Sequence, residues 1–416
     1  MTGPRGPRRP FAGRRVVLGV TGGIAAYKAI AVARDLALAG ATVEVVLTEG
    51  ALEFVRPLSF AALTGRPAHV DAWEQAEPLL HIRLAREADV VLVAPATANF
   101  MARAAAGMAD DLLTAVLLAT EAPVVVCPAM NDRMYAHPAT QANLRRLADF
   151  GYRIAGPGVG PLAWGEGEGP GRLLEPDEIV AHAGRALEPA GALAGRRVVV
   201  TAGPTREAID PVRYIGNRSS GRMGYEIAAA AWRRGADVTL VSGPSHLPPP
   251  AGVRLVRIET AEQMRAAVAA ELPAADALVM AAAVADFRPS APADQKIKKE
   301  AGEVPVIRLE RTADVLLATR DARPARCVVV GFALETTDVL ANGRRKLSAK
   351  GLHLLVANDA TEPGSGFEVE TNRVTILSAD GEDEHLPLLS KAEVADHILD
   401  RVAVLLPASD PAAGLD

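Results

Sequence analysis

Runs of small apolar residues alternate with segments of helical periodicity along most of the chain. In the first half, the apolar runs that predict strands are residues 16–20, 43–47, 90–93 and 124–127. The segments whose spacing predicts helices are residues 24–38, 112–119 and 141–150. Strands that are apolar throughout and separated by helices are typical of a parallel sheet covered on both faces. We therefore expect a doubly wound α/β fold.

The opening of the chain is repeated near its middle. Ala-Gly-Arg-Arg-Val-Val occurs at residues 12–17 and again at residues 194–199. The strands predicted after the repeat are residues 198–201, 278–280, 328–330 and 354–357. A hairpin is predicted around residues 374–377, and the last helix at 391–405. Two Rossmann-like domains with parallel sheets, each opening on a nucleotide-type βαβ unit, are the simplest account.

Loss of periodicity predicts where the domains end. We expect a disordered tail over residues 1–13, which are rich in Pro, Gly and Arg, and a first domain over 14–182. Residues 183–194 are predicted to be a linker, and the second domain to span 195–405. Residues 406–416 form a second tail.

Composition excludes several classes of protein. Hydrophobic residues make up 49% and charged residues 23% of the 416-residue chain, which is ordinary for a globular protein. The net charge of −5 gives no general affinity for nucleic acid, and no apolar run is long enough to span a membrane. Cys127 and Cys327 lie in apolar runs, so we expect buried thiols and a reducing cytoplasm, with no disulfide framework and no cysteine metal site.

A loop rich in polar side chains and glycine follows the first strand of the second half. It gathers Asn217, Arg218 and Arg222 with several further Arg, Ser and Thr residues, and an alanine-rich helix follows it. A helix start with glycines and hydroxyls ahead of it binds anions, since unpaired backbone N–H groups point there. The alternative is a solvated polar loop.

The second half resembles the phosphopantothenoylcysteine synthetase family across about residues 195–400. The matching segments are TAGPTREAIDPVRYIGNRSSGRMGY, AAAVADF, QKIKK and GFALET. The resemblance implies a ligase that uses CTP and Mg²⁺ to join 4′-phosphopantothenate to L-cysteine through an acyl-cytidylate.

The resemblance also assigns roles to single residues. Asn217 would hold the acyl-nucleotide, Lys296 would stabilise the transferring phosphate, and Arg218 and Arg222 would bind the substrate phosphate. The implied CTP contacts are Asp286, Lys296, Asp314, Phe332, Lys346 and Lys350. Lys346 and Lys350 are four residues apart on one helix face, where like charges destabilise unless an anion lies between them. For the Lys-rich run around Lys296, a solvated face is the alternative.

The loop after the first strand of the chain, Gly-Val-Thr-Gly-Gly-Ile-Ala-Ala-Tyr-Lys, lacks the GxGxxG spacing of a dinucleotide site. Thr21 and the backbone of Gly22, Gly23 and Ile24 would hold a single phosphate, as in FMN. Thr48 and Thr97 end two further strands. Ligands of open α/β sheets bind at the carboxyl ends of strands, so these hydroxyls should face one crevice. The alternative is that they only cap strand ends.

Most of residues 14–150 resembles the flavin-containing cysteine decarboxylases, in particular phosphopantothenoylcysteine decarboxylase. The matching segments are GVTGGIAAYKA, HIRLAREADVVLVAPATANFMARAAAGMADDLLT and PAMNDRMY. The resemblance implies a flavodoxin-like domain with FMN, in which Asn99 lies beside the flavin and Asn131 binds the substrate carboxylate. His81 would be the base or proton relay, and Met130 and Met134 would shape the substrate pocket.

One segment departs from the decarboxylase pattern. The family often carries a cysteine as proton donor in a mobile flap, and here Trp164 stands at that position. Glu166 or Glu168 could donate the proton if flap closure raised its pKa, or both could be solvated flap charges.

The whole chain thus resembles bifunctional coenzyme A biosynthesis proteins, which implies trimeric flavin domains and dimeric ligase domains, together a dodecamer. Two other functions remain open. One is a ligase whose flavin domain lost decarboxylation with its cysteine, and the other is a nicotinamide-dependent oxidoreductase. Two features count against a nicotinamide cofactor: the absence of GxGxxG, and the end of the second strand, where Leu47 and Thr48 stand in place of an acidic residue.

Overall fold

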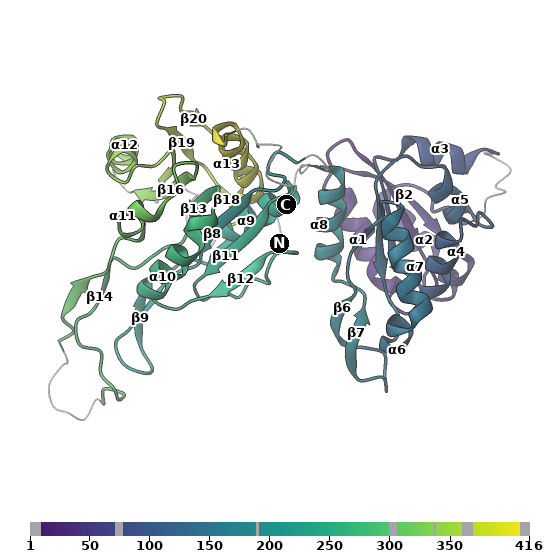
Figure 1. Cartoon of the computed structure of the whole chain (residues 1–416), viewed down its shortest axis with the longest axis horizontal. Coiled ribbons are helices and arrows are strands. Elements are labelled where there is room, and N and C mark those ends of the chain that lie inside the picture. The colour runs from purple at the N-terminus through teal and green to yellow at the C-terminus, as the bar shows by residue number, and fades with distance from the viewer. Residues whose placement is uncertain are drawn as a thin grey trace. The chain divides into compact units, whose positions relative to one another are not determined.

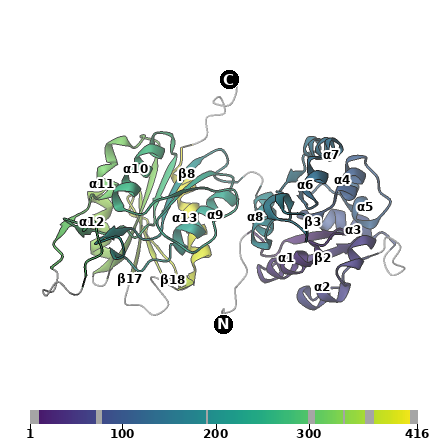
Figure 2. The same cartoon turned by 90° about the horizontal axis from the view of Figure 1, so that it is seen from below.

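The computed structural model describes residues 10–70, 78–188, 191–298, 306–335, 338–359 and 369–407. The chain divides into two compact units, residues 1–189 and 190–416, which we call the N-terminal and C-terminal units. Each unit contains a largely parallel sheet with helices packed on it (Figures 1 and 2). The predicted α/β fold class is confirmed.

The N-terminal unit is built on a five-stranded sheet with the order β2-β1-β3-β4-β5, and all its neighbours are parallel. The strands are β1 (Arg15–Val20), β2 (Thr42–Leu47), β3 (Val90–Ala96), β4 (Val124–Pro128) and β5 (Arg153–Ile154). This is the flavodoxin-like strand order, in which the topological switch lies between β1 and β3. Every residue of β3 is buried, as its uninterrupted apolar run predicts.

Helices cover both faces of this sheet (Figure 1). On one face, α1 (Ala26–Leu38), α2 (Pro57–Thr64) and α8 (Pro176–Leu187) share one hydrophobic cluster. On the other face lie α3 (Leu80–Glu87), α4 (Ala98–Ala105), α5 (Leu112–Ala119) and α7 (Pro138–Asp149). The short α6 (Asp132–Ala136) precedes α7, and the antiparallel pair β6 (Gly158–Pro161) and β7 (Glu168–Arg172) forms a separate hairpin.

Two predicted boundaries in this unit are wrong. The tail was expected to extend to residue 13, but Phe11 is 5% exposed and packs in the core, so the ordered chain begins earlier. Helix α8 continues to Leu187, inside the predicted linker. Its apolar face (Ile179, Ala183 and Ala186) is buried against the α1 side of the sheet, and this packing carries the helix past the point where local periodicity fades.

The C-terminal unit contains an eight-stranded sheet with the order β12-β11-β8-β13-β16-β17-β19-β20. The strands are β8 (Arg197–Ala202), β11 (Asp237–Ser242), β12 (Arg254–Arg257), β13 (Ala277–Met280), β16 (Val328–Glu335), β17 (Leu354–Asp359), β19 (Thr375–Ser378) and β20 (Glu384–His385). The first six in this order are parallel, and β19 and β20 add the predicted antiparallel hairpin. The order reverses at β8 and β13, which is where Rossmann-type sheets bind ligands.

Two helix layers flank this sheet (Figure 2). Helices α9 (Arg222–Arg233) and α13 (Lys391–Leu405) pack against each other, whereas α10 (Ala261–Glu271), α11 (Val315–Ala318) and α12 (Val339–Ala349) share another cluster. Three small antiparallel pairs complete the unit: β9 (Arg206–Ala208) with β10 (Tyr214–Gly216), β14 (Phe287–Pro289) with β15 (Leu309–Arg311), and β18 (Thr371–Asn372) with β21 (Leu389–Ser390). Among the described residues, no helix is long and apolar enough to cross a bilayer.

Candidate functional site

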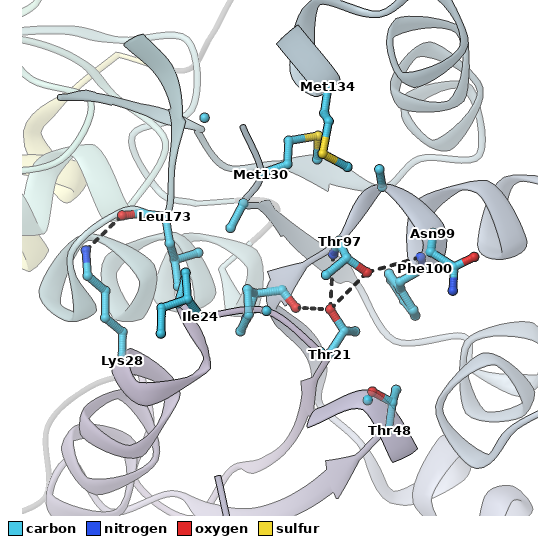
Figure 3. A pocket seen from close by; sticks show the side chains of 18 of the residues that line it. Thr21, Ile24, Lys28, Thr48, Thr97, Asn99, Phe100, Met130, Met134 and Leu173 are labelled. Carbon is cyan, nitrogen blue, oxygen red and sulfur yellow. Dashed lines mark hydrogen bonds between the residues drawn. The ribbon is translucent and has the colours of Figure 1, made fainter. Parts of the chain in front are cut away.

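The N-terminal unit has a cavity of about 1420 Å³ at the carboxyl ends of its strands (Figure 3). The loops after β1, β2, β3 and β4 form its walls, and the β6–β7 hairpin contributes one side. All residues predicted to contact flavin line it: Thr21, Gly22, Gly23, Ile24, Thr48, Thr97 and Asn99. The parallel strand order brings these sequence-distant loops to one edge.

Two of the three predicted threonines, Thr21 and Thr97, form a hydrogen-bond network beside this cavity, whereas Thr48 bonds to the Val20 carbonyl instead (Figure 3). Thr21 Oγ1 donates to the Pro95 carbonyl at 2.8 Å and accepts from the Thr97 amide at 3.0 Å. Thr97 Oγ1 accepts from the Phe100 amide at 3.3 Å and caps α4. Because Thr21 is buried and uses its proton internally, the network shapes the loop and leaves the backbone to meet a phosphate.

Two loops approach each other closely beside this network. A Cβ atom on Gly22 would lie 2.6 Å from the carbonyl carbon of Gly50, in the loop after β2. On Gly23 the same atom would lie 3.6 Å from its nearest neighbour, Thr97 Cγ2. The close packing of the loops after β1 and β2 therefore requires glycine at position 22, whereas position 23 has room for a Cβ atom.

The opposite end of the cavity carries the predicted substrate residues. Met130, Asn131 and Met134 line it, and Asn131 Oδ1 accepts from the Arg133 amide at 2.9 Å. The Met130 amide donates to the Gly171 carbonyl at 2.9 Å, which fixes the end of the hairpin to this wall. Ile24 is 66% exposed, so the cavity offers an apolar face suited to a planar ring.

The β6–β7 hairpin is the predicted flap. Its residues Pro161, Leu162, Ala163 and Glu166 line the cavity, whereas Trp164 and Glu168 do not belong to the lining. Trp164 is fully exposed and Glu168 lies exposed on β7. Of the two candidate carboxyls, Glu166 is thus the one at the cavity.

A buried lysine anchors the end of the flap. Lys28 Nζ donates to the Leu173 carbonyl at 3.0 Å and to Glu175 Oε1 at 2.9 Å, and Arg172 also bonds to Glu175 (Figure 3). The hydrogen bond from Lys28 holds the pKa of the Glu175 carboxyl below its ordinary value, against desolvation. No sequence pattern predicts this contact, because 145 residues separate Lys28 from Leu173.

His81, the predicted proton relay, lies apart from the cavity lining. It occupies the first turn of α3, on the helix layer that packs with α5. A single copy of the chain therefore does not bring His81 together with Asn131 in this cavity.

The C-terminal unit has a cavity of about 410 Å³ at the switch point of its sheet. The predicted ligase residues that line it are Asn217, Arg222, Asp286, Asp314, Phe332, Lys346 and Lys350. They come from the polar loop after β8, the loop after β13, the start of α11, strand β16 and the end of α12. Asn217 Nδ2 donates to the Ala283 and Val284 carbonyls, each at 3.1 Å, and so ties the first loop to the second.

The like charges of Lys346 and Lys350 at the cavity are partly neutralised by an ion pair. Lys350 Nζ lies 2.7 Å from Asp314 Oδ2. Desolvation acts to raise the pKa of Asp314, but the hydrogen bonds from Lys350 and from the backbone of Leu317 outweigh it and hold that pKa below its ordinary value. This ion pair relieves the repulsion expected between Lys346 and Lys350.

Lys296 and Arg218 are not part of this cavity lining. Lys296 is exposed, and its neighbour Ile297 donates its amide to Asp210 Oδ2 at 3.2 Å while its carbonyl accepts from Arg213. The loop of Lys296 is therefore fixed to the polar loop that follows β8. The cavity contains three residues that sequence reasoning missed: Asn358, Asn372 and Lys391.

Comparison with known proteins identifies the family. The family described as "Flavoprotein" matches residues 6–187, and "DNA/pantothenate metabolism flavoprotein C-terminal domain" matches residues 193–405. A protein from Vibrio cholerae named "Coenzyme A biosynthesis bifunctional protein CoaBC" is 46% identical over 392 residues, 94% of this chain and 98% of the relative. The protein of that name from Mycolicibacterium smegmatis is 48% identical over 413 residues, 96% and 99% of the two chains.

A crystal structure described as the C-terminal domain of a CoaBC protein is 42% identical and covers 52% of this chain and 97% of that one, with a TM-score of 0.44. The two family matches together span both units of the fold. This chain therefore belongs to the family of bifunctional coenzyme A biosynthesis proteins.

Proposed function

We propose that the protein catalyses two consecutive steps of coenzyme A biosynthesis. The C-terminal unit joins 4′-phosphopantothenate to L-cysteine with CTP, and the N-terminal unit decarboxylates the product to 4′-phosphopantetheine. The observation that carries the proposal is that each unit has a cavity at the carboxyl ends of its strands, lined by motif residues of one of the two reactions.

In the ligase step, we assign positioning of the acyl-cytidylate to Asn217, whose amide is already held by two carbonyls. Asp286, Asp314, Phe332, Lys346 and Lys350 would surround CTP. Among the described residues no group of three or more His, Cys, Asp or Glu gathers to hold a metal ion. Mg²⁺ would therefore arrive with the triphosphate and neutralise it.

In the decarboxylation step, the cavity dimensions and the glycine-rich loop after β1 fit FMN, with the phosphate at the backbone of Gly22, Gly23 and Ile24. FMN supplies the redox chemistry that makes loss of CO₂ from the carbon next to the thiol-bearing one easy. Asn131 would orient the substrate carboxylate, and Met130 and Met134 would shape its pocket. The buried thiols of Cys127 and Cys327 fit the cytoplasmic location that we propose.

Glu166 is our candidate for the proton donor that the flap cysteine supplies elsewhere in the family. It lines the cavity, so closure of the flap would bring its carboxyl to the bound substrate as a proton donor. The variant with Glu166→Gln and Glu168→Gln together should form 4′-phosphopantetheine more slowly. Full-rate formation by this variant would rule both carboxyls out.

Of the competing functions, the nicotinamide-dependent oxidoreductase is set aside, because the family is a different one. The hypothesis of a ligase with an impaired flavin domain rests only on Trp164 at the position of the flap cysteine. No observation in the N-terminal cavity favours this hypothesis.

We also propose that flavin domains assemble as trimers and ligase domains as dimers, together a dodecamer. His81 does not line the cavity of its own chain, which supports this assembly because a neighbouring copy would supply the histidine. Mixing His81→Ala with Asn131→Ala subunits, each inactive alone, should restore part of the decarboxylase activity. No recovery in mixed oligomers would exclude a shared site.

The deciding experiment is a one-pot assay by mass spectrometry with FMN, 4′-phosphopantothenate, cysteine, CTP and Mg²⁺. Formation of 4′-phosphopantetheine is the expected outcome. Accumulation of 4′-phosphopantothenoylcysteine alone would identify a ligase with an impaired flavin domain, and absence of both products would refute the proposal.

A further inference from the structure

The C-terminal cavity is lined by a basic pair, of which one member, Lys391, lies outside the sequence motifs. Arg222 is the first residue of α9 and Lys391 the first residue of α13, and these two helices pack against each other. Both residues line the cavity, together with Asn358 and Asn372. Lys346 and Lys350 reach the same cavity from α12, in the other helix layer (Figure 2). The cavity thus has basic side chains on two sides.

Lys391 is unusual in its burial. It is only 4% exposed, which is rare for a lysine. Desolvation and the neighbouring charge of Arg222, acting against Glu226, lower the pKa of its ammonium group to about 8. Its surroundings are polar, since Asn358 Nδ2 donates to Asn372 Oδ1 at 3.4 Å beside it. A second cation next to a buried ammonium is favourable where an anion joins them.

The backbone holds Lys391 rigidly at this position. Its amide donates to the Glu370 carbonyl at 3.0 Å, and the Glu370 side chain lies 3.8 Å from Arg222. Ser390 and Glu393 form a capping box that begins α13 directly before Lys391. These bonds place the main chain of Lys391 at a helix start beside the cavity, which suits a bound oxyanion.

We propose that Lys391 is a further substrate-binding residue of the ligase, which contacts a phosphate group of CTP or of 4′-phosphopantothenate together with Arg222. The inference rests on the proposed ligase function, whose substrates are both phosphorylated. Phosphate is the shared chemistry, and the two substrates can be varied separately to find its source.

The experiment measures steady-state pyrophosphate release by the full-length protein, with each substrate varied in turn. Lys391→Met keeps the length of the buried chain but removes the charge, so it should raise the KM for one phosphorylated substrate about 10- to 100-fold, the effect of losing one charge-assisted hydrogen bond. Lys391→Arg should restore most of the affinity. Calorimetric titration of the Lys391→Met protein with CTP alone then identifies the phosphate that Lys391 contacts. Weaker CTP binding than in the wild type assigns the contact to the nucleotide, and unchanged CTP binding assigns it to 4′-phosphopantothenate.

Ser390→Ala is the matched control, since it removes the cap of α13 but leaves the ammonium in place. It should lower the melting temperature without changing either KM. The proposal is overturned if Lys391→Met, or Lys391→Gln should the Met variant not fold, leaves both KM values within twofold of wild type. It is also overturned if Ser390→Ala raises KM equally, because the effect would then belong to the helix. A wild-type protein that releases no pyrophosphate would refute the ligase function itself.

Discussion

Single residues in this protein act through the loops that they hold together as much as through their own side chains. Thr21 uses its hydroxyl to join the loop after β1 to the end of β3, and Asn217 uses its amide to join two loops of the ligase cavity. A polar residue at a strand end is therefore both a structural tie and a wall of the site. Thr97 shows both sides of this, since it caps helix α4 and also lines the cavity.

Substitutions of Gly22 and Gly23 test the close approach of the loops after β1 and β2. Gly22→Ala places a methyl group 2.6 Å from the backbone of Gly50, and such overpacking typically costs about 1–3 kcal/mol. We expect a lower melting temperature and weaker FMN binding, measured by flavin fluorescence. Gly23→Ala meets nothing closer than 3.6 Å and should keep the wild-type melting temperature. Equal melting temperatures of the two variants would contradict this account of the loop.

A comparison of Lys296 and Lys298 variants tests whether Lys296 acts in the transition state or is only a solvated charge. Both are exposed residues of one lysine-rich run. Lys296→Gln should lower the rate of CTP-dependent pyrophosphate release about 100-fold or more while CTP still binds, because a lost transition-state contact lowers kcat. Lys298→Gln should remain close to wild type. If Lys296→Gln also releases pyrophosphate at the normal rate, the role assigned to Lys296 is wrong.

Among the elements, the edge strand β2 carries a buried charge cluster centred on Glu44. Glu44 is 3% exposed, accepts from Arg66 at 3.0 Å and lies 3.2 Å from His69 Nε2, with Arg83 at 3.5 Å. The hydrogen bond with His69 acts with Arg66 and Arg83, against desolvation, to lower the pKa of Glu44 to about 2. The cluster ties β2 to the segment before α3 and to α3 itself.

This cluster gives a pH-dependent stability. The Glu44 pKa is lower in the folded than in the unfolded chain, so its stabilisation is present above pH 4.5 and is lost as pH falls toward about 2. At about 1.4 kcal/mol per pKa unit, the N-terminal unit should lose roughly 3 kcal/mol over this window. Urea unfolding of Glu44→Gln should show a flatter acid profile than wild type, and the exposed Glu53→Gln should not. Parallel profiles for wild type and Glu44→Gln would exclude the cluster as the cause.

At the scale of the whole molecule, the chain contains two units, each with its own sheet, helix layers and cavity. Neither cavity draws a described residue from the other unit. Each unit can therefore respond to its own ligand.

Two thermal transitions should follow from this organisation. A ligand at about 100 times its Kd stabilises its unit by about 2.7 kcal/mol, which is about 5–10 °C for a unit of this size. In scanning calorimetry, FMN should raise one melting transition and CTP with Mg²⁺ the other. Gly22→Ala should lower only the transition that FMN raises. A single transition that moves with both ligands would show that the units unfold cooperatively.

The amino-acid sequence by itself determined the alternation of strands and helices, the two α/β units and the motif loops at their strand ends. These features depend on local periodicity and on turn residues, which one stretch of chain carries alone. The meeting of distant segments came from the folded chain instead: Lys28 bonds to Glu175, and Lys391 shares a cavity with Arg222 because α9 and α13 pack together. The tertiary structure also extended α8 to Leu187 and placed Phe11 in the core, because burial against neighbouring elements outweighs weak local signals.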